Sequence, residues 1–161
     1  MDAIELLKKQ HEEVKSLFGQ YENTEDGRSK RGIFIRIADN LAAHATIEEK
    51  IFYPAVYVGE LRDLLEEAVE EHLSAKRIIA DLLDMSVEDD AFDAKVKVLK
   101  EQIEHHIEEE EGEMFGKVKK AVDQSQREQL GAEMEELFTE LMSDSPRLAV
   151  PDETSEAAPL E

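Results

Sequence analysis

His44-Ala-Thr-Ile-Glu48 and His106-Ile-Glu-Glu-Glu110 share one spacing, a histidine followed four residues later by a glutamate. On a helix, residues four apart lie about 40° apart around the axis and one turn along it. Each pair can therefore hold one metal centre from one helix face. Single histidines, His11 and His72, lie on the helical stretches before and between the pairs. Four helices that offer these residues at one level predict a bundle with two metal ions at its centre.

Helical periodicity extends over most of the chain. Apolar residues recur three or four positions apart, and alternating strand patterns are absent. The predicted fold class is all-α, an up-down-up-down four-helix bundle, because short connections make neighbouring helices antiparallel. The fourth helix is expected to open at Ser86-Val87-Glu88-Asp89, which resembles a capping box. The long helices are expected at about residues 2–21, 29–59, 60–85 and 86–118.

The phase and depth of the histidines place them together. His11, His44, His72 and His106 lie on the apolar stripes of their helices, well inside each helix. Since antiparallel neighbours meet midpoint to midpoint, we expect the four imidazoles to converge on one layer of the bundle. His105 is adjacent to His106 and falls off the stripe. We therefore expect His105 to be partly exposed, or to contact a ligand side chain from outside.

The C-terminal part differs from the bundle in composition. A shorter amphipathic segment over about 124–142 is expected to pack as a fifth helix. Residues 143–161 hold three of the four prolines, together with acidic and small residues, which is typical of a solvated tail. The predicted organisation is a four-helix bundle over 1–122, an additional helix over 123–142, and a disordered, flexible acidic tail over 143–161.

Composition excludes several classes of function. There is no cysteine, so disulfides and thiolate metal sites are excluded. The 40 acidic and 19 basic residues give a formal net charge of −21, which repels phosphate backbones and anionic lipids. Neither a nucleic-acid nor a membrane partner is therefore expected. The N-terminus lacks the basic flank of a signal peptide, and no stretch approaches a membrane span, so we expect a cytoplasmic protein.

The glutamates of the two pairs argue against a purely structural polar core. Burying Glu48 and Glu110 without cations is costly, and neither apolar stripe supplies an inward Arg or Lys beside them. Metal ions are the expected compensation, and a metal-free polar core is the alternative. Phe52, Tyr53 and Phe115 are expected to pack near the site, with tyrosine ligation the lesser alternative.

Together these residues resemble the hemerythrin family, in particular its bacterial HHE cation-binding branch. The resemblance covers about residues 2–120, and it is specific because order, spacing and phase agree at once. Ferritin-like bundles use Glu-x-x-His pairs, with the opposite order and a spacing of three. The stretches that carry the resemblance are His11-Glu-Glu, His44 to Pro54, Glu71-His72, and His106 to Phe115.

The resemblance implies a centre of two iron ions, with a bridging oxo or hydroxo group. Nitrogen and oxygen ligands alone would equally suit manganese or zinc. The ligands that it implies are His11 and His44 on one iron, His72 and His106 on the other, and Glu48 and Glu110 as bridges.

The sequence departs from the oxygen-carrying members of that family at one place. Those members have a second histidine one turn away on the third helix, where this chain has Ala68 and Lys76. One terminal donor is therefore missing, which leaves open metal positions and favours reactivity over reversible oxygen storage. Lys76 is expected to hydrogen-bond a bound ligand, or a carboxylate such as Glu109 or Glu71.

The leading functional prediction is a di-iron protein that binds or senses a small diatomic or peroxide ligand. Oxygen, nitric oxide and peroxide are the candidate ligands, and a sensor would act through a protein partner because no output domain is present. The first alternative is an enzyme that decomposes peroxide or reduces nitric oxide. The second is an iron-sensing or iron-handling domain. The sequence favours no particular oligomeric state.

Overall fold

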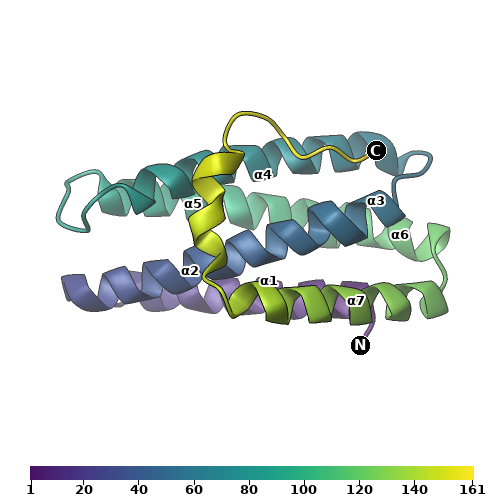
Figure 1. The fold of residues 1–161 in the computed structure, drawn as a ribbon, viewed down its shortest axis with the longest axis horizontal. Coiled ribbons are helices and arrows are strands. Elements are labelled where there is room, and N and C mark those ends of the chain that lie inside the picture. The colour runs from purple at the N-terminus through teal and green to yellow at the C-terminus, as the bar shows by residue number, and fades with distance from the viewer.

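Four long helical runs form a bundle in the antiparallel order that the sequence predicts (Figure 1). The computed structural model describes all residues, 1–161, and contains no strand, so the predicted all-α fold is confirmed. The elements are α1 (Ala3–Glu22), α2 (Gly27–Ile47), the π-helical turn η1 (Glu48–Phe52), α3 (Tyr53–Ala55), α4 (Leu61–Leu83), α5 (Phe92–Glu109), the π-helical turn η2 (Glu110–Met114), α6 (Phe115–Ala121), α7 (Gln124–Met142) and the 3-10 helix η3 (Pro146–Glu153).

Side-chain hydrogen bonds set where helices begin. The Glu5 backbone N–H donates to the Asp2 side chain at 3.0 Å, and the Asp2 N–H donates back to Glu5 at 3.2 Å, a capping box that starts α1. The capping box expected at Ser86 is wrong. Ser86 and Asp89 satisfy each other's polar groups within a turn, and α5 begins only at Phe92, whose side chain is buried in the core.

The second and fourth helical runs change pitch directly after the His-x-x-x-Glu spacing. The turns η1 and η2 each begin at the glutamate of a pair. Pro54 follows η1 and has no N–H for the α-helical ladder, while η2 contains Gly112, a weak helix former. On a regular α-helix, a residue five positions past the glutamate would lie about 140° away. The wider turns return Tyr53 and Phe115 toward the interior, where both are buried.

A polar layer divides the hydrophobic core into two clusters. In α1, Leu7 belongs to the first cluster and Val14 to the second, with His11 between them. The same change of cluster occurs around the single buried histidine of α2, of α4 and of α5. The four histidines therefore share one level, and apolar side chains seal that level on both sides.

The C-terminal part covers the bundle more closely than its composition predicts. Helix α7 packs against α1 and α2, as expected for the fifth helix (Figure 1). The expectation of a flexible, disordered tail is corrected by the structure, because η3 crosses α2 and reaches α4. Val150 is buried, and Arg147 forms an ion pair with Asp39 at 3.0 Å. One buried side chain and a few specific polar contacts order this segment, and average composition does not encode them.

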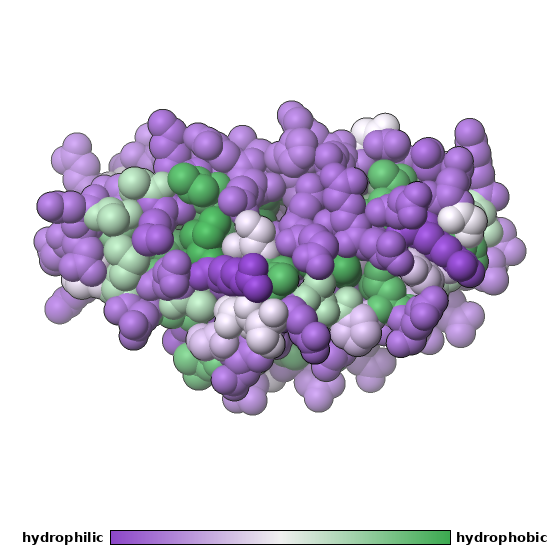
Figure 2. All heavy atoms as spheres, turned by 90° about the horizontal axis from the view of Figure 1, so that it is seen from above, coloured by the Kyte–Doolittle hydropathy of each residue, from purple (hydrophilic) through white to green (hydrophobic).

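The surface is dominated by charge. Figure 2 shows the face that carries α4 and the C-terminal segment, where hydrophilic side chains surround smaller hydrophobic patches. None of the helices combines the length and apolar character that crossing a bilayer requires.

Candidate metal centre

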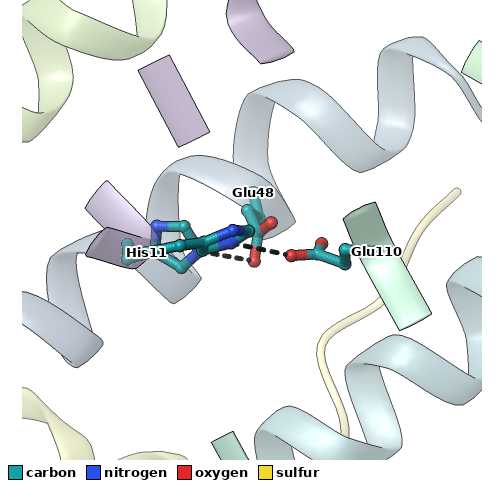
Figure 3. A group of neighbouring side chains, drawn as sticks. His11, Glu48 and Glu110 are labelled. Carbon is teal, nitrogen blue, oxygen red and sulfur yellow. Dashed lines mark ion pairs between the residues drawn. The ribbon is translucent and has the colours of Figure 1, made fainter. Parts of the chain in front are cut away.

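The six predicted ligand residues meet in the polar layer. None of their side chains is more than 10% exposed, and two, Glu48 and Glu110, are at most 1% exposed. Figure 3 shows His11, Glu48 and Glu110 pointing toward one another from three different segments. The role of these side chains as metal ligands stays a prediction. The residues that the structure brings together are His11 from α1, His44 from α2, Glu48 from η1, His72 from α4, His106 from α5 and Glu110 from η2.

The Nε2 atoms of the imidazoles face the two carboxylates. One oxygen of each carboxylate, Oε1, lies close to histidines of both predicted metal pairs. The distances from Glu48 Oε1 are 3.1 Å to His72, 3.3 Å to His44 and 3.8 Å to His106, and those from Glu110 Oε1 are 3.2 Å to His11 and 3.4 Å to His106. The side chains form two groups, and within each group the possible ligand atoms all lie within 4.8 Å of one another. The first group is His11, His44, Glu48 and Glu110, and the second is Glu48, His72 and His106.

The outer nitrogen of each site histidine is held by an oxygen acceptor from a neighbouring helical run. Carboxylate and amide oxygens accept only, so Nδ1 carries the proton, and the lone pair of a neutral Nε2 faces inward. Outer hydrogen bonds of this kind orient histidine metal ligands. The Nδ1 bonds are His11 to Glu111 at 2.6 Å, His44 to Gln10 at 2.7 Å, His72 to Glu49 at 2.7 Å, and His106 to Glu71 at 2.8 Å.

Sequence reasoning missed these four acceptors, although each is adjacent in the chain to a predicted ligand. Gln10 precedes His11 but serves the histidine of α2, and Glu111 follows Glu110 but serves the histidine of α1. The signal in the sequence is therefore a polar residue adjacent to a predicted ligand. The histidine that this polar residue supports lies on another helix.

The inward-facing atoms lack hydrogen-bond donors. Both oxygens of Glu48, Oε1 of Glu110, and Nε2 of His11 and His44 are buried without a hydrogen-bond partner. Converging lone pairs in a dry layer are unfavourable unless a cation lies between them. The residues therefore fit bound metal ions, and their imidazole nitrogens and carboxylate oxygens suit iron, manganese or zinc.

Tyr53 belongs to the layer, although packing near the site was its first expected role and ligation only the lesser alternative. Its hydroxyl donates to Glu110 Oε2 at 2.6 Å and lies 3.4 Å from Nε2 of both His72 and His106. Its ring stacks on His72 with the centroids 5.5 Å apart. Burial, followed by the charges of Glu110 and Glu48, raises the pKa of Tyr53 well above its ordinary value. When no metal is bound, the Tyr53 hydroxyl is therefore neutral. Its oxygen can serve as a further metal ligand beside His72 and His106.

The structure places Lys76 and His105 outside the layer. Lys76 is buried and pairs with Glu49 at 2.9 Å and Glu153 at 3.1 Å, so its expected pairing with Glu71 or Glu109 is wrong. Glu49, which directly follows Glu48, reaches α4 and is the carboxylate that pairs with Lys76 instead. The His105 side chain is 64% exposed and lies 3.0 Å from Glu109. The predicted assignment of His106 to the interior and His105 to the outside agrees with this geometry.

Charges within the layer determine where protons lie when no metal is bound. Burial opposes a positive charge on His106, but Glu110, Glu48 and Glu71 together outweigh burial and hold the pKa of His106 well above its ordinary value. Neighbouring carboxylates, Glu110 first at His11 and Glu48 first at His72, likewise together outweigh burial, so the pKa of each imidazole is raised. Protons on these imidazoles compete with metal ions for the same nitrogen atoms.

The carboxylates shift in the opposite direction. Burial favours the neutral form of Glu48, but the charges of the nearby imidazoles, His44 first, hold the pKa of Glu48 well below its ordinary value. Burial is also outweighed at Glu49, whose pKa is lowered by its hydrogen bond to His72. The metal-free layer therefore keeps ionised carboxylates and gathers protons on its histidines.

The fold and the layer define a cation-binding helical bundle, with imidazole and carboxylate donors projecting inward from facing helices. The chain belongs to the hemerythrin family, because the family model for the hemerythrin HHE cation binding domain matches residues 2–118. This confirms the family predicted from the sequence.

Two comparisons place the chain among known proteins. Its structure is similar to the crystal structure of a hemerythrin HHE cation binding domain-containing protein from Mycobacterium kansasii, with a TM-score of 0.83 and 21% sequence identity over 95% of this chain and 99% of that one. This likeness supports the fold alone. In sequence, the chain is 26% identical over 135 residues to a protein named DNA nickase from Nostoc sp. strain PCC 7120. The match covers 83% of this chain but only 38% of that relative.

Replacing the two adjacent histidines separately tests which of them faces the layer. His106→Ala should lower metal content and change the visible spectrum, because it removes an inward Nε2. His105→Ala should leave both nearly unchanged, because His105 points outward. Metal analysis and absorption spectra of the two purified variants provide the measurement. Loss of metal in His105→Ala with retention in His106→Ala would mean that the register of α5 is wrong by one residue.

Metal removal should make stability depend on pH. Imidazoles with raised pKa values stabilise the metal-free fold below their ordinary value of 6.5, and this stabilisation is lost as pH rises through their folded values. Carboxylates with lowered pKa values stabilise the metal-free fold above pH 4.5, their ordinary pKa, and this stabilisation is lost as pH falls through their folded values. Metal-free protein should therefore melt highest between these pH values, and its melting temperature should fall as pH rises above 6.5.

The metal-loaded protein should show the opposite trend above pH 6.5, because fewer protons then compete with the metal. A metal at a thousandfold excess over Kd adds about 4 kcal/mol of stability. The gap between the two melting temperatures should widen from pH 6 to pH 8 in calorimetry. Equal melting of both forms, or a gap that narrows over this interval, would contradict buried histidine ligands.

Proposed function

We propose that this protein holds a dinuclear iron centre and uses it to bind a small ligand, namely dioxygen, nitric oxide or peroxide. The observation that carries the proposal is a layer of six predicted ligand side chains that is poor in hydrogen-bond donors and lies beside an apolar cavity. The cavity volume is about 40 Å³. One water molecule needs about 10–15 Å³ on this measure, so a ligand of two or three atoms fits.

Iron is the metal that membership of the hemerythrin family supports. The donor set is compatible with it, since imidazoles and carboxylates also serve in other di-iron helical bundles. Two iron ions held by these residues would supply open coordination positions and a change of redox state at the edge of the cavity. The histidines of the two predicted pairs would hold one ion each, and Glu48 and Glu110 would hold both.

The protein contributes orientation and water exclusion. Aliphatic side chains such as Leu41, Ile79 and Ile103 line the cavity beside the four imidazoles, and they keep the ligand site poor in water. The outer hydrogen bonds fix each imidazole ring before metal binds. Tyr53 presents a hydroxyl to the layer and can donate a hydrogen bond there.

A resident centre is better supported than an iron cargo site. The ligand side chains are at most 10% exposed and lie between two apolar clusters. Releasing iron from them would require local opening of the bundle.

Breakdown of hydrogen peroxide is a second candidate function, and Tyr53 is the observation that favours it. Two molecules of hydrogen peroxide would yield dioxygen and two water molecules, so no external reductant is needed. The Tyr53 hydroxyl is 2.6 Å from Glu110, and the pair can hold or move a proton at the layer. Steady turnover with peroxide would distinguish this enzyme from a protein that only binds its ligand.

We propose no nucleic-acid partner for this chain. The relative from Nostoc carries the name DNA nickase, but this chain spans 38% of its length. A formal net charge of −21 repels phosphate, and the layer lies inside the bundle. We propose a protein partner as the route by which a sensor built on this centre would transmit ligand binding.

Anaerobic loading with ferrous iron tests the proposal. The protein should bind two iron ions per chain, since each group of donors offers one position. Exposure to dioxygen, nitric oxide or peroxide should then change the visible spectrum. Metal analysis and optical titration provide the measurement. Saturation at one ion per chain would contradict the dinuclear centre, and a full load of iron that ignores all three ligands would contradict ligand binding.

Tyr53→Phe tests the tyrosine. If the Tyr53 oxygen binds ferric iron, its phenolate produces a visible charge-transfer absorption. The Tyr53→Phe variant should then lose this band while it retains two irons. The substitution keeps the ring that stacks on His72, so the fold should persist. Tyr57→Phe is the matched control, because Tyr57 bonds Glu66 far from the layer. An unchanged spectrum in Tyr53→Phe would leave Tyr53 as a hydrogen-bond donor to Glu110 only.

A further inference from the structure

We infer that the C-terminal strap, residues 143–161, forms the removable wall of the ligand cavity, and that Val150 limits which ligands reach the metal centre. This inference rests on the proposed ligand-binding function. It assigns control of access to a segment that lies outside the residues matched by the family model, which end at 118.

Val150 completes the cavity from outside the bundle. It is 2% exposed and is the one buried residue of the strap. The same cavity is lined by all four site histidines, by Ala42 and Ala45 of α2, and by Ala75 of α4. A ligand in this cavity would therefore lie between the imidazoles on one side and the Val150 side chain on the other.

A gap between α2 and α4 explains why a wall is needed there. The two helices contact each other much less than each contacts η3, which crosses from α2 to α4 (Figure 1). The alanines on the facing sides are too small to close the gap. Val150 fills it, so displacement of η3 would open a path from solvent to the histidines.

Beside Val150, the strap packs only the partly buried side chains of Ala157 and Leu160 against the first cluster, and its other anchoring contacts are polar, which makes local opening easier than unfolding. Arg147 pairs with Asp39 at 3.0 Å, and Arg77 donates to the Thr154 carbonyl at 2.9 Å. Glu153 reaches Lys76 at 3.1 Å. Partly exposed ion pairs contribute little to stability, because solvent screens their charges. With one buried side chain and such contacts, the strap belongs to the least stable part of the fold.

One strap contact also connects to the metal layer. Lys76 joins Glu153 of the strap to Glu49, and Glu49 holds the Nδ1 proton of His72. Opening the strap removes Glu153 from Lys76, so Lys76 then pairs with Glu49 alone. The position of the strap is therefore linked to the support of one ligand, and ligand access and ligand orientation change together.

Ligand-binding rates of the fully iron-loaded chain test the inference, with azide and the longer thiocyanate as probes. Val150→Ala should speed binding of both probes by about tenfold, because it removes buried methyl groups that hold the wall closed. Leu148→Ala is the matched control on the same strap, since Leu148 is 66% exposed, and it should bind at the rate of the unmodified protein. Stopped-flow absorption gives the rates.

Asp39→Asn is a second variant that loosens the strap without changing the cavity wall. It removes the carboxylate charge that anchors Arg147, so it too should speed binding and should increase hydrogen exchange over residues 146–153 in metal-free and metal-loaded protein. Unfolding curves should stay close to those of the unmodified chain in all three variants, which separates access from loss of fold.

The outcomes separate the inference from the proposed function. Equal probe rates in the unmodified, Val150→Ala and Asp39→Asn proteins would overturn the inference and leave ligand binding intact. Probe binding only in the two loosened variants would support the inference strongly. Two irons per chain with no probe binding in any variant would overturn both the proposed function and the inference.

Discussion

The structure depends on one constraint, which is that carboxylate and imidazole lone pairs converge in a dry layer across the middle of the bundle. Such a layer is unfavourable unless cations or protons lie within it. The support around it forms a closed ring. The α1 run supplies Gln10 to the histidine of α2, and each following run supplies a carboxylate to the histidine of the next, until Glu111 returns to α1. Each helix therefore both offers a ligand and positions one from its neighbour.

The repeated spacing predicted the positions of the histidines because a regular helix converts sequence distance into direction. His44, His72 and His106 could be placed in phase and in depth from the apolar stripes alone, and the fold agrees with this. The same rule failed where the backbone stops being a regular helix. Tyr53 reaches the layer only because η1 is wider than an α-helical turn. Contacts between distant segments, such as Val150 with α2 and α4, leave no periodic signal in the sequence.

The internal repeat produces two similar halves with different chemistry. Both glutamates begin a π-helical turn, and the residue five positions later carries an aromatic ring that stacks on a histidine of the layer. In the first copy this residue is Tyr53, and in the second it is Phe115. Only the His72–His106 side therefore has a hydroxyl within reach. The outer supports differ as well, because His44 is held by a neutral amide and His72 by a carboxylate that is paired with Lys76. The two halves of the site are thus inequivalent before any ligand binds.

Stability and access are separated in space. The two apolar clusters flank the layer along the bundle and consist of side chains from several helices, so the ends of the site cannot open without loss of the core. The side between α2 and α4 is different, because small alanines there leave room that one valine from the strap fills. A bundle closed by its own larger side chains at this position would be more rigid, but its ligands could be reached only by unfolding. Under the proposed function, covering the gap with a segment held by ion pairs would allow the core to stay intact while small ligands reach the layer.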